Sequence, residues 1–310
     1  MVSSQGAVAT KRAPERGRKR TWRDLPWVAL FLGPNFVLFF VFTAFPIVFG
    51  LAVSFIKWNI VEPWSFVGLA NYRQLLFEDP LTWKTIGISL YYTVGVLPFS
   101  LAFSLFFAIL LNQRIRALGF WRGIFFLPMV TSGVAIALVW KWLYAYQFGA
   151  VNWAIALVGI QRQNWLFNPS LVMPAVIVVA IWAAMPVQII FFLAGLQNVP
   201  KDLYEAASID GAGRWQSFAN VTWPLISPTV FFLTVITFIH SMTGGFDIVW
   251  NMTQGGPIDA SNLYVVQLFR TAFVYFQMGY ASAMAYALFV VILIVTIFQW
   301  KAQDRWVHYG

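Results

Sequence analysis

Six long apolar segments decide what this chain can fold into. A helix needs about 20 mostly apolar residues to cross the hydrocarbon core of a bilayer. Of the 310 residues, 60% are hydrophobic and 10% are charged, whereas soluble domains usually carry about 25% charged residues. A soluble core could not bury that much apolar surface. We therefore predict an all-α membrane protein with six transmembrane helices, at about 27–55, 87–111, 123–144, 171–195, 224–243 and 282–300.

Lysine and arginine residues predict the orientation of these spans, because cytoplasmic loops carry an excess of them. With the N-terminus inside, 14 of the 20 fall on the inner side and 6 on the outer side. The outer ones are Lys57, Arg73, Lys84, Lys141, Arg162 and Arg270. Both termini are therefore predicted to be cytoplasmic. Residues 1–26 are predicted to be a basic, disordered tail that meets membrane lipid rather than nucleic acid, and 27–310 the transmembrane domain.

The sequence contains no recognisable catalytic constellation. It has no cysteine and only two histidines, His240 and His308, so no disulfide and no metal-binding cluster is expected. It also lacks a phosphate-binding glycine loop, so we expect no ATP hydrolysis and no cofactor on this chain. His240 alone lies well inside a predicted span. The lack of a chain of intramembrane charges disfavours a proton- or sodium-driven carrier.

A polar island at 196–223 separates the fourth and fifth predicted spans, on the cytoplasmic side. Pro200 suits the first turn of a helix, and acidic residues follow it in positions that the helix dipole favours. Leu203, Ala206 and Ala207 share one face, and the two alanines make that face small. Gly211 and Gly213 offer left-handed positions that end a helix. This pattern fits either a helix on the membrane surface or a helix that docks into another protein.

The spacing within the island resembles a known motif. Glu205-Ala206-Ala207, then Gly211, then Val221 and Trp223-Pro224, is similar to the EAA loop of permease subunits of bacterial ATP-binding-cassette importers. That family favours isoleucine and leucine where this chain has Val221 and Trp223. Four further segments resemble the carbohydrate-uptake branch, and the last of them its maltose- and glycerol-phosphate-type "A" subunit. They are 66–72 (FVGLANY), 126–128 (FLP), 194–200 (AGLQNVP) and 253–257 (TQGGP).

This resemblance implies a type I importer permease fold in the bacterial cytoplasmic (inner) membrane. The implied partners are a second homologous permease, two ATPase subunits that bind ATP and magnesium, and an extracytoplasmic substrate-binding protein. The EAA helix would be the coupling helix seated on the ATPase. Its implied coupling residues are Leu203, Glu205 as the acidic contact, Ala206 and Ala207 as the close-approach face, Asp210, Gly211 as the turn, and Pro224. ATP binding would then bias a two-state rocking motion.

Two further sets of residues are candidates for contact with solute or partner. Polar groups in or near the fourth and fifth spans are candidates for the substrate path, although each could equally be a helix–helix hydrogen bond. They are Gln188, His240, Ser241, Thr243 and Asn251. The turn formed by Thr253, Gly255, Gly256 and Pro257 is either an ordinary loop or a docking site for the binding protein.

The resemblance predicts an importer for a sugar or oligosaccharide. Two alternatives remain open at this stage. The same importer class could carry glycerol phosphate or another polyol derivative, and the chain could instead be a stand-alone secondary carrier, which would expect internal repeats or intramembrane charges. A membrane scaffold with no transport activity is a third possibility.

Overall fold

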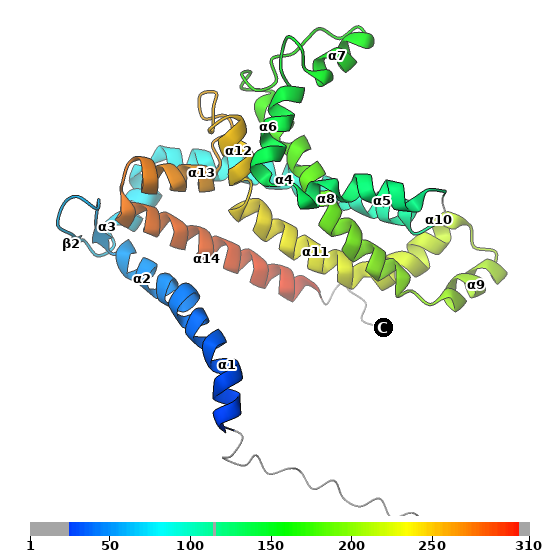
Figure 1. Ribbon diagram of the computed structural model, residues 1–310, viewed down its shortest axis with the longest axis horizontal. Helices are drawn as coiled ribbons and strands as arrows, with labels where there is room; N and C mark the ends of the chain where they lie inside the picture. Colours follow the sequence, from blue (N-terminus) through cyan, green and yellow to red (C-terminus); the bar gives the residue numbers. More distant parts are fainter. Residues whose placement is uncertain (1–24, 114–115, 304–310) are drawn as a thin grey trace, which may run out of the picture. The chain divides into compact units, whose positions relative to one another are not determined.

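The computed structural model describes residues 25–113 and 116–303 (Figure 1). The chain divides into two compact units, residues 1–50 and 51–310. Most of the predicted basic tail, together with His308 and the C-terminal end, lies outside the described residues. The described part is overwhelmingly helical, which confirms the predicted all-α class.

A single apolar helix occupies the described part of the first unit and continues to Ser54. It runs over 29 residues, Pro26–Ser54, where 27–55 was predicted. Only 6% of its apolar window is buried inside the chain, which suits a helix whose solvent is lipid. Pro34 is accommodated inside it. Its consecutive parts are α1 (Leu25–Phe39), the π-helical turn η2 (Phe40–Ala44) and α2 (Phe45–Ser54).

The second unit contains the remaining long helices. Three are continuous: α4 (Pro80–Leu111), α8 (Val172–Gln197) and α14 (Met278–Ala302). α4 begins seven residues before the predicted span at 87, because Asp79 caps it by accepting a hydrogen bond from the Leu81 amide at 2.9 Å. The fourth apolar stretch, Arg214–Met252, extends beyond both ends of the predicted 224–243. It is built from α10 (Arg214–Ser217), η5 (Phe218–Thr222), α11 (Trp223–Thr243) and α12 (Phe246–Met252).

The third predicted span, 123–144, is not one straight helix. α5 (Leu118–Phe126) and the short turn η4 (Leu127–Val130) are followed by α6 (Gly133–Leu143), which is bent from them by 109°. Thr131 is extended, and the Ser132 hydroxyl caps α6 by accepting from the Ala135 amide at 3.3 Å. The described residues therefore hold five helices long enough to cross a membrane, or six if this bent pair forms one span.

Shorter elements connect the spans. A two-residue antiparallel ladder, which the all-α prediction did not include, pairs Ile56 with Phe66 and Lys57 with Ser65. A short helical segment, formed by α3 and η3, covers 70–78. The connecting elements are β1 (Ile56–Lys57), β2 (Ser65–Phe66), α3 (Ala70–Arg73), η3 (Gln74–Glu78), α7 (Ala150–Leu157), α13 (Tyr264–Phe269) and η6 (Arg270–Val274).

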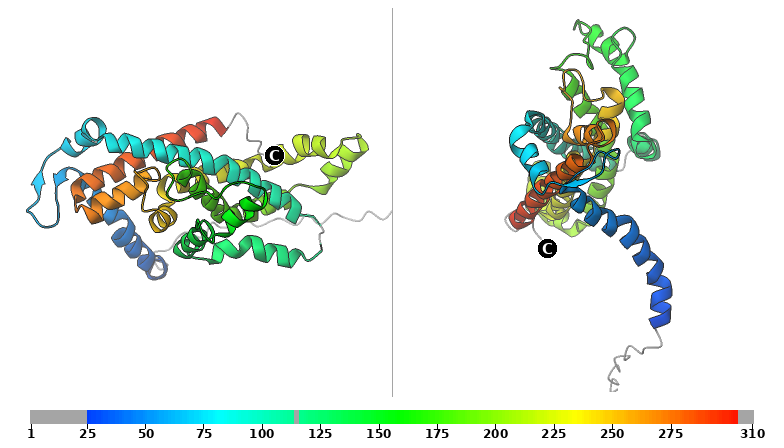
Figure 2. Two further views of the ribbon diagram at one scale, coloured as in Figure 1. Left: turned by 90° about the horizontal axis from the view of Figure 1, so that it is seen from above. Right: turned by 90° about the vertical axis from the view of Figure 1, so that its left-hand side faces the viewer.

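The core of the second unit lies where α4, α8 and α11 run side by side, as the two views of Figure 2 show together with Figure 1. Leu111, Ile189, Phe192 and Ile226 are almost fully buried there. Gly195 lets α8 approach α11 closely, because a Cβ at this position would lie 2.8 Å from the Thr229 hydroxyl. Small residues allow the same close approach in membrane helices generally.

Candidate functional sites

The candidate coupling helix is α9 (Lys201–Ile209), in the loop between α8 and α10. Pro200 precedes its first turn and Asp202 lies within it, as the sequence predicts. Gly211 takes the predicted left-handed conformation, with φ of +78°. Gly213 does not: its φ is −70°, and it instead begins α10, where its amide donates to Gln216 at 2.8 Å. One glycine is enough to end the helix.

The face of α9 that points away from the protein carries most of the predicted coupling residues. Leu203 is 42% exposed, and Glu205, Ala206 and Asp210 are also exposed. Ala207 is half-buried, so the small-residue face turns partly toward the protein. Among the residues that the structure describes, no side-chain hydrogen bond occupies the Glu205 carboxylate. The helix therefore presents an accessible, acidic and small-residue surface.

A single tyrosine anchors α9, and the sequence prediction did not single it out. The Tyr204 hydroxyl hydrogen-bonds the Thr222 hydroxyl at 2.9 Å. Its ring packs against the cluster that contains Leu196 and Ile226. A cleft of about 430 Å³, lined by Tyr204 and Ser208, lies between α9 and the end of α4 near Asn112. α9 is thus linked to the start of α11 through one side chain and is otherwise loosely packed.

The second residue of α11 is Pro224, which is half-buried. Thr222, which holds Tyr204, ends the π-helical turn η5 immediately before α11. Trp223 remains 42% exposed, and its ring is tilted by 51° against that of Phe218, with ring centroids 6.3 Å apart. α10, η5 and α11 are therefore one continuous helical segment, and the Tyr204–Thr222 hydrogen bond joins α9 to it.

The structure places Gln188 inside the helix core. It is 4% exposed. Its Nε2 donates to the hydroxyls of Ser100 at 3.1 Å and Thr237 at 3.0 Å, and its Oε1 accepts from Ser104 at 2.8 Å. These bonds connect α4, α8 and α11. Gln188 thus forms hydrogen bonds between helices, which was the alternative to contact with substrate. Its place in the substrate path remains a prediction.

The other four path candidates lie around the end of α11. His240 and Thr243 are exposed, while Ser241 is buried. The Thr243 hydroxyl donates to the Ile239 carbonyl at 2.8 Å, and the Asn251 amide donates to the Asp247 carbonyl at 2.7 Å. Two of the four therefore bond to their own helix and stay at least partly accessible.

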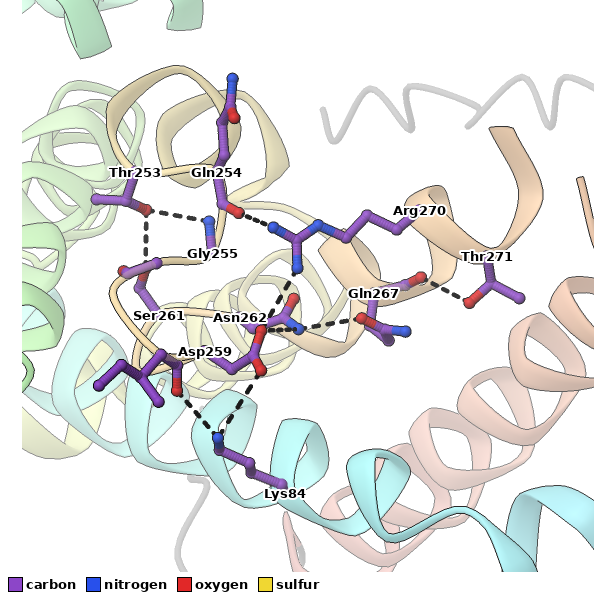
Figure 3. Close-up of polar contacts among 12 residues, drawn as sticks. Lys84, Thr253, Gln254, Gly255, Asp259, Ser261, Asn262, Gln267, Arg270 and Thr271 are labelled. Atoms are coloured by element: carbon purple, nitrogen blue, oxygen red, sulfur yellow. Dashed lines mark hydrogen bonds and ion pairs between the residues drawn. The ribbon is translucent and has the colours of Figure 1, made fainter. Parts of the chain in front are cut away.

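The predicted docking turn is part of a tightly bonded loop between α12 and α13, shown in Figure 3. The Thr253 hydroxyl bonds that of Ser261 at 2.7 Å and accepts from the Gly255 amide at 3.3 Å. Ser261 also donates to the Gly256 carbonyl at 2.5 Å. Gly255 has a φ of +83°, which suits glycine, and the Gly256–Pro257 peptide is cis.

Charged residues that the sequence prediction did not single out tie this loop to two helices. Asp259 lies 3.4 Å from an Arg270 nitrogen of η6 and 3.9 Å from Lys84 of α4. Lys84 also donates to the Ile258 carbonyl at 3.0 Å, and Arg270 donates to the Gln254 carbonyl (Figure 3). The tip stays accessible, since Ile258 is 83% exposed. The loop is a fixed platform with one exposed apolar side chain.

Comparison with known families identifies the chain. Residues 91–307 match the model of the binding-protein-dependent transport system inner membrane component. The chain belongs to this family. The match contains α8, the coupling loop, α11 and the loop of Figure 3. The predicted resemblance is thereby confirmed at the level of the family, and the stand-alone carrier is disfavoured.

Curated relatives match over nearly the full length. The probable ABC transporter permease protein YesP of Bacillus subtilis is 34% identical, with 90% of this chain and 91% of the relative covered. The multiple sugar-binding transport system permease protein MsmF of Streptococcus mutans is 32% identical, with coverage of 90% and 96%. The sn-glycerol-3-phosphate transport system permease protein UgpA of Agrobacterium fabrum is 29% identical, with coverage of 79% and 83%.

Solved structures share the fold. A chain of a bacterial ABC transporter that imports the acidic polysaccharide alginate superposes with a TM-score of 0.80, at 24% identity, covering 91% of this chain and 96% of that one. A second similar structure, with a TM-score of 0.80, is a bacterial alginate ABC transporter in complex with a periplasmic protein that holds an alginate pentasaccharide. The likeness confirms the predicted type I importer permease fold.

Proposed function

We propose that this chain is the permease subunit of an ATP-driven, binding-protein-dependent importer for a sugar or oligosaccharide. The observation that carries the proposal is α9, an exposed acidic helix fastened to the start of α11 by Tyr204 in a chain of this family. A partner that binds such a helix can transmit movement directly to the membrane-spanning core.

Coupling follows from this geometry. A separate ATPase grips the exposed face formed by Leu203, Glu205 and Ala206, with ATP and magnesium bound on the ATPase. When the ATPase dimer closes, it displaces α9. The Tyr204–Thr222 bond passes that displacement to η5, which is continuous with α11. α11 packs on α4 and α8, so the core moves as a rigid body between two states.

The other parts of the proposal rest on the family and its relatives. A second homologous permease completes the path, and a binding protein delivers solute on the outer side. The loop at Thr253–Pro257 is its proposed docking platform. The proposed location is the bacterial cytoplasmic membrane with both termini inside. Sugar permeases and a glycerol-phosphate permease are both relatives, so a phosphorylated polyol is the competing substrate class.

The proposal is tested by co-purification and uptake. Glu205→Lys reverses the exposed charge that would face the ATPase. We expect it to reduce recovery of the ATPase with this chain by about tenfold or more, a loss typical of an interface hot spot, and to abolish ATP-dependent uptake. The matched control is Glu78→Lys, whose carboxylate is also exposed and pairs with Arg73. Retention of both ATPase recovery and uptake in Glu205→Lys would refute the coupling role.

A further inference from the structure

Asp247 is the one carboxylate in the long apolar stretch Arg214–Met252. It lies in the first turn of α12, just past the point where the predicted fifth span ended at 243. It is exposed on the surface of the chain. A carboxylate that follows a membrane span this closely is expected to meet water, a partner or a counter-charge.

The surroundings of Asp247 do not supply a counter-charge. No hydrogen bond or ion pair joins its carboxylate to any residue within 25–113 or 116–303. It lies against Gly133 at the bend before α6, where a Cβ would be 3.1 Å from Oδ2. Asp247 is not the cap of α6, because Ser132 already fills that role. The charge therefore lies beside the start of α6 without capping that helix.

Polar groups close to Asp247 in the sequence are also accessible, at least in part. Asn251 lies one turn further along α12, on the same face as Asp247. His240 and Thr243 are exposed one turn apart near the end of α11. In contrast, the exposed residues of α14, such as Ile294, are apolar and suit lipid. An exposed polar surface on an otherwise apolar segment indicates a hydrated path.

We propose that Asp247 lines the solute path and gives it a negative potential that favours neutral saccharides over anionic solutes. This rests on the proposed importer function and deepens it, because it separates a sugar from glycerol phosphate. The charge lies beside the backbone of α6, whose positive N-terminal end offsets it in part. The remaining field repels a phosphate or carboxylate that passes within a few ångströms.

The chain has no native cysteine, so a single introduced thiol reports on this field. Asn251→Cys is made in the assembled importer with Asp247 or with Asp247→Asn. The introduced thiol of each form is treated separately with a cationic reagent, trimethylammonium-ethyl methanethiosulfonate, and an anionic one, sulfonato-ethyl methanethiosulfonate. The mass of this chain gives the extent of modification over time, and hence the rate for each reagent. With a carboxylate about 6 Å away, we expect the cationic-to-anionic rate ratio to fall by about five- to tenfold in Asp247→Asn.

Two further variants make the result decisive. Asp247→Glu keeps the charge and is expected to keep the high ratio. Ile294→Cys, on the apolar face of α14, is expected to react with neither reagent. If Asp247→Asn fails to assemble, Asp247→Ser serves as the uncharged form.

An unchanged ratio would overturn the proposal, and so would a thiol in Asn251→Cys that reacts with neither reagent, with and without ATP. Either outcome is distinct from failure of the proposed function, because the reaction rates do not depend on contact with an ATPase, whereas the Glu205→Lys test does.

Discussion

The loop before α10 and the loop after α12 lie at opposite ends of one helical stretch, Arg214–Met252, yet they are held very differently. Within the described residues, one side-chain hydrogen bond, Tyr204 to Thr222, joins α9 to the rest of the chain. The loop of Figure 3 is bonded to α4, α13 and η6 through Lys84, Asn262 and Arg270. The first arrangement suits a helix that a partner protein displaces, and the second suits a loop that keeps its position.

Each of the two loops contains a left-handed glycine, and these two glycines are a matched pair for the comparison. Gly255 has φ of +83°, and a Cβ there would lie 3.2 Å from Asn262, whereas Gly211 has φ of +78° and nothing within 4 Å. We expect Gly255→Ala to cost about 2 kcal/mol, from strain and crowding together, and Gly211→Ala about 1 kcal/mol from strain alone. Thermal denaturation in detergent measures both. Equal losses would show that the two loops are equally packed.

The ion pairs of Asp259 give the next largest effect. Asp259→Asn removes charge contacts with Lys84 at 3.9 Å and Arg270 at 3.4 Å, in a setting where the carboxylate is 36% exposed. We expect a loss of about 0.5–1 kcal/mol, which shrinks in 1 M salt because exposed charges are screened. Glu78→Gln, at the more exposed Arg73–Glu78 pair, is the control and should change stability little. A salt-independent loss would show that charge is not what fixes the loop.

Tyr204→Phe tests the anchor of α9. It deletes a hydrogen bond that contributes about 1 kcal/mol or less, and the loss is local because α9 has few other contacts. We expect faster amide hydrogen exchange in Lys201–Ile209 with little change in global melting. Tyr72→Phe, which removes a 2.7 Å bond to Ser54 elsewhere, should leave exchange in α9 unchanged. If amide exchange in α9 is unaltered in Tyr204→Phe, the Tyr204 hydroxyl is not what anchors α9.

The sequence predicted most of the fold because length and apolarity decide where a helix can cross a bilayer. The fourth span was predicted at 171–195, and α8 runs Val172–Gln197. The prediction of a straight third span was wrong. Both of its halves are apolar, and an average of hydropathy over a window does not depend on the direction in which the chain runs. The clue was local: Ser132 can cap a new helix, and Gly133 follows it.

The site was only partly predictable. The charges, the helix start and the turn at Gly211 follow from local rules, and α9 has them. The anchor at Tyr204 and the unpaired charge at Asp247 depend on which residues the fold brings together. Thr222 lies 18 residues from Tyr204, and Asp247 meets Gly133 from a different span. Gln188 likewise became a helix–helix contact only once α4 and α11 were placed around it.

The most direct test of the account measures which loop the ATPase covers. Ala206→Cys on α9 and Ile258→Cys at the tip of the Figure 3 loop each place one exposed thiol in this cysteine-free chain. Maleimide labelling is followed in the permease pair with and without its ATPase. The account predicts that the ATPase slows labelling of Ala206→Cys by about tenfold or more and leaves labelling of Ile258→Cys unchanged. Equal labelling of Ala206→Cys in the two samples would contradict the claim that α9 is the coupling helix.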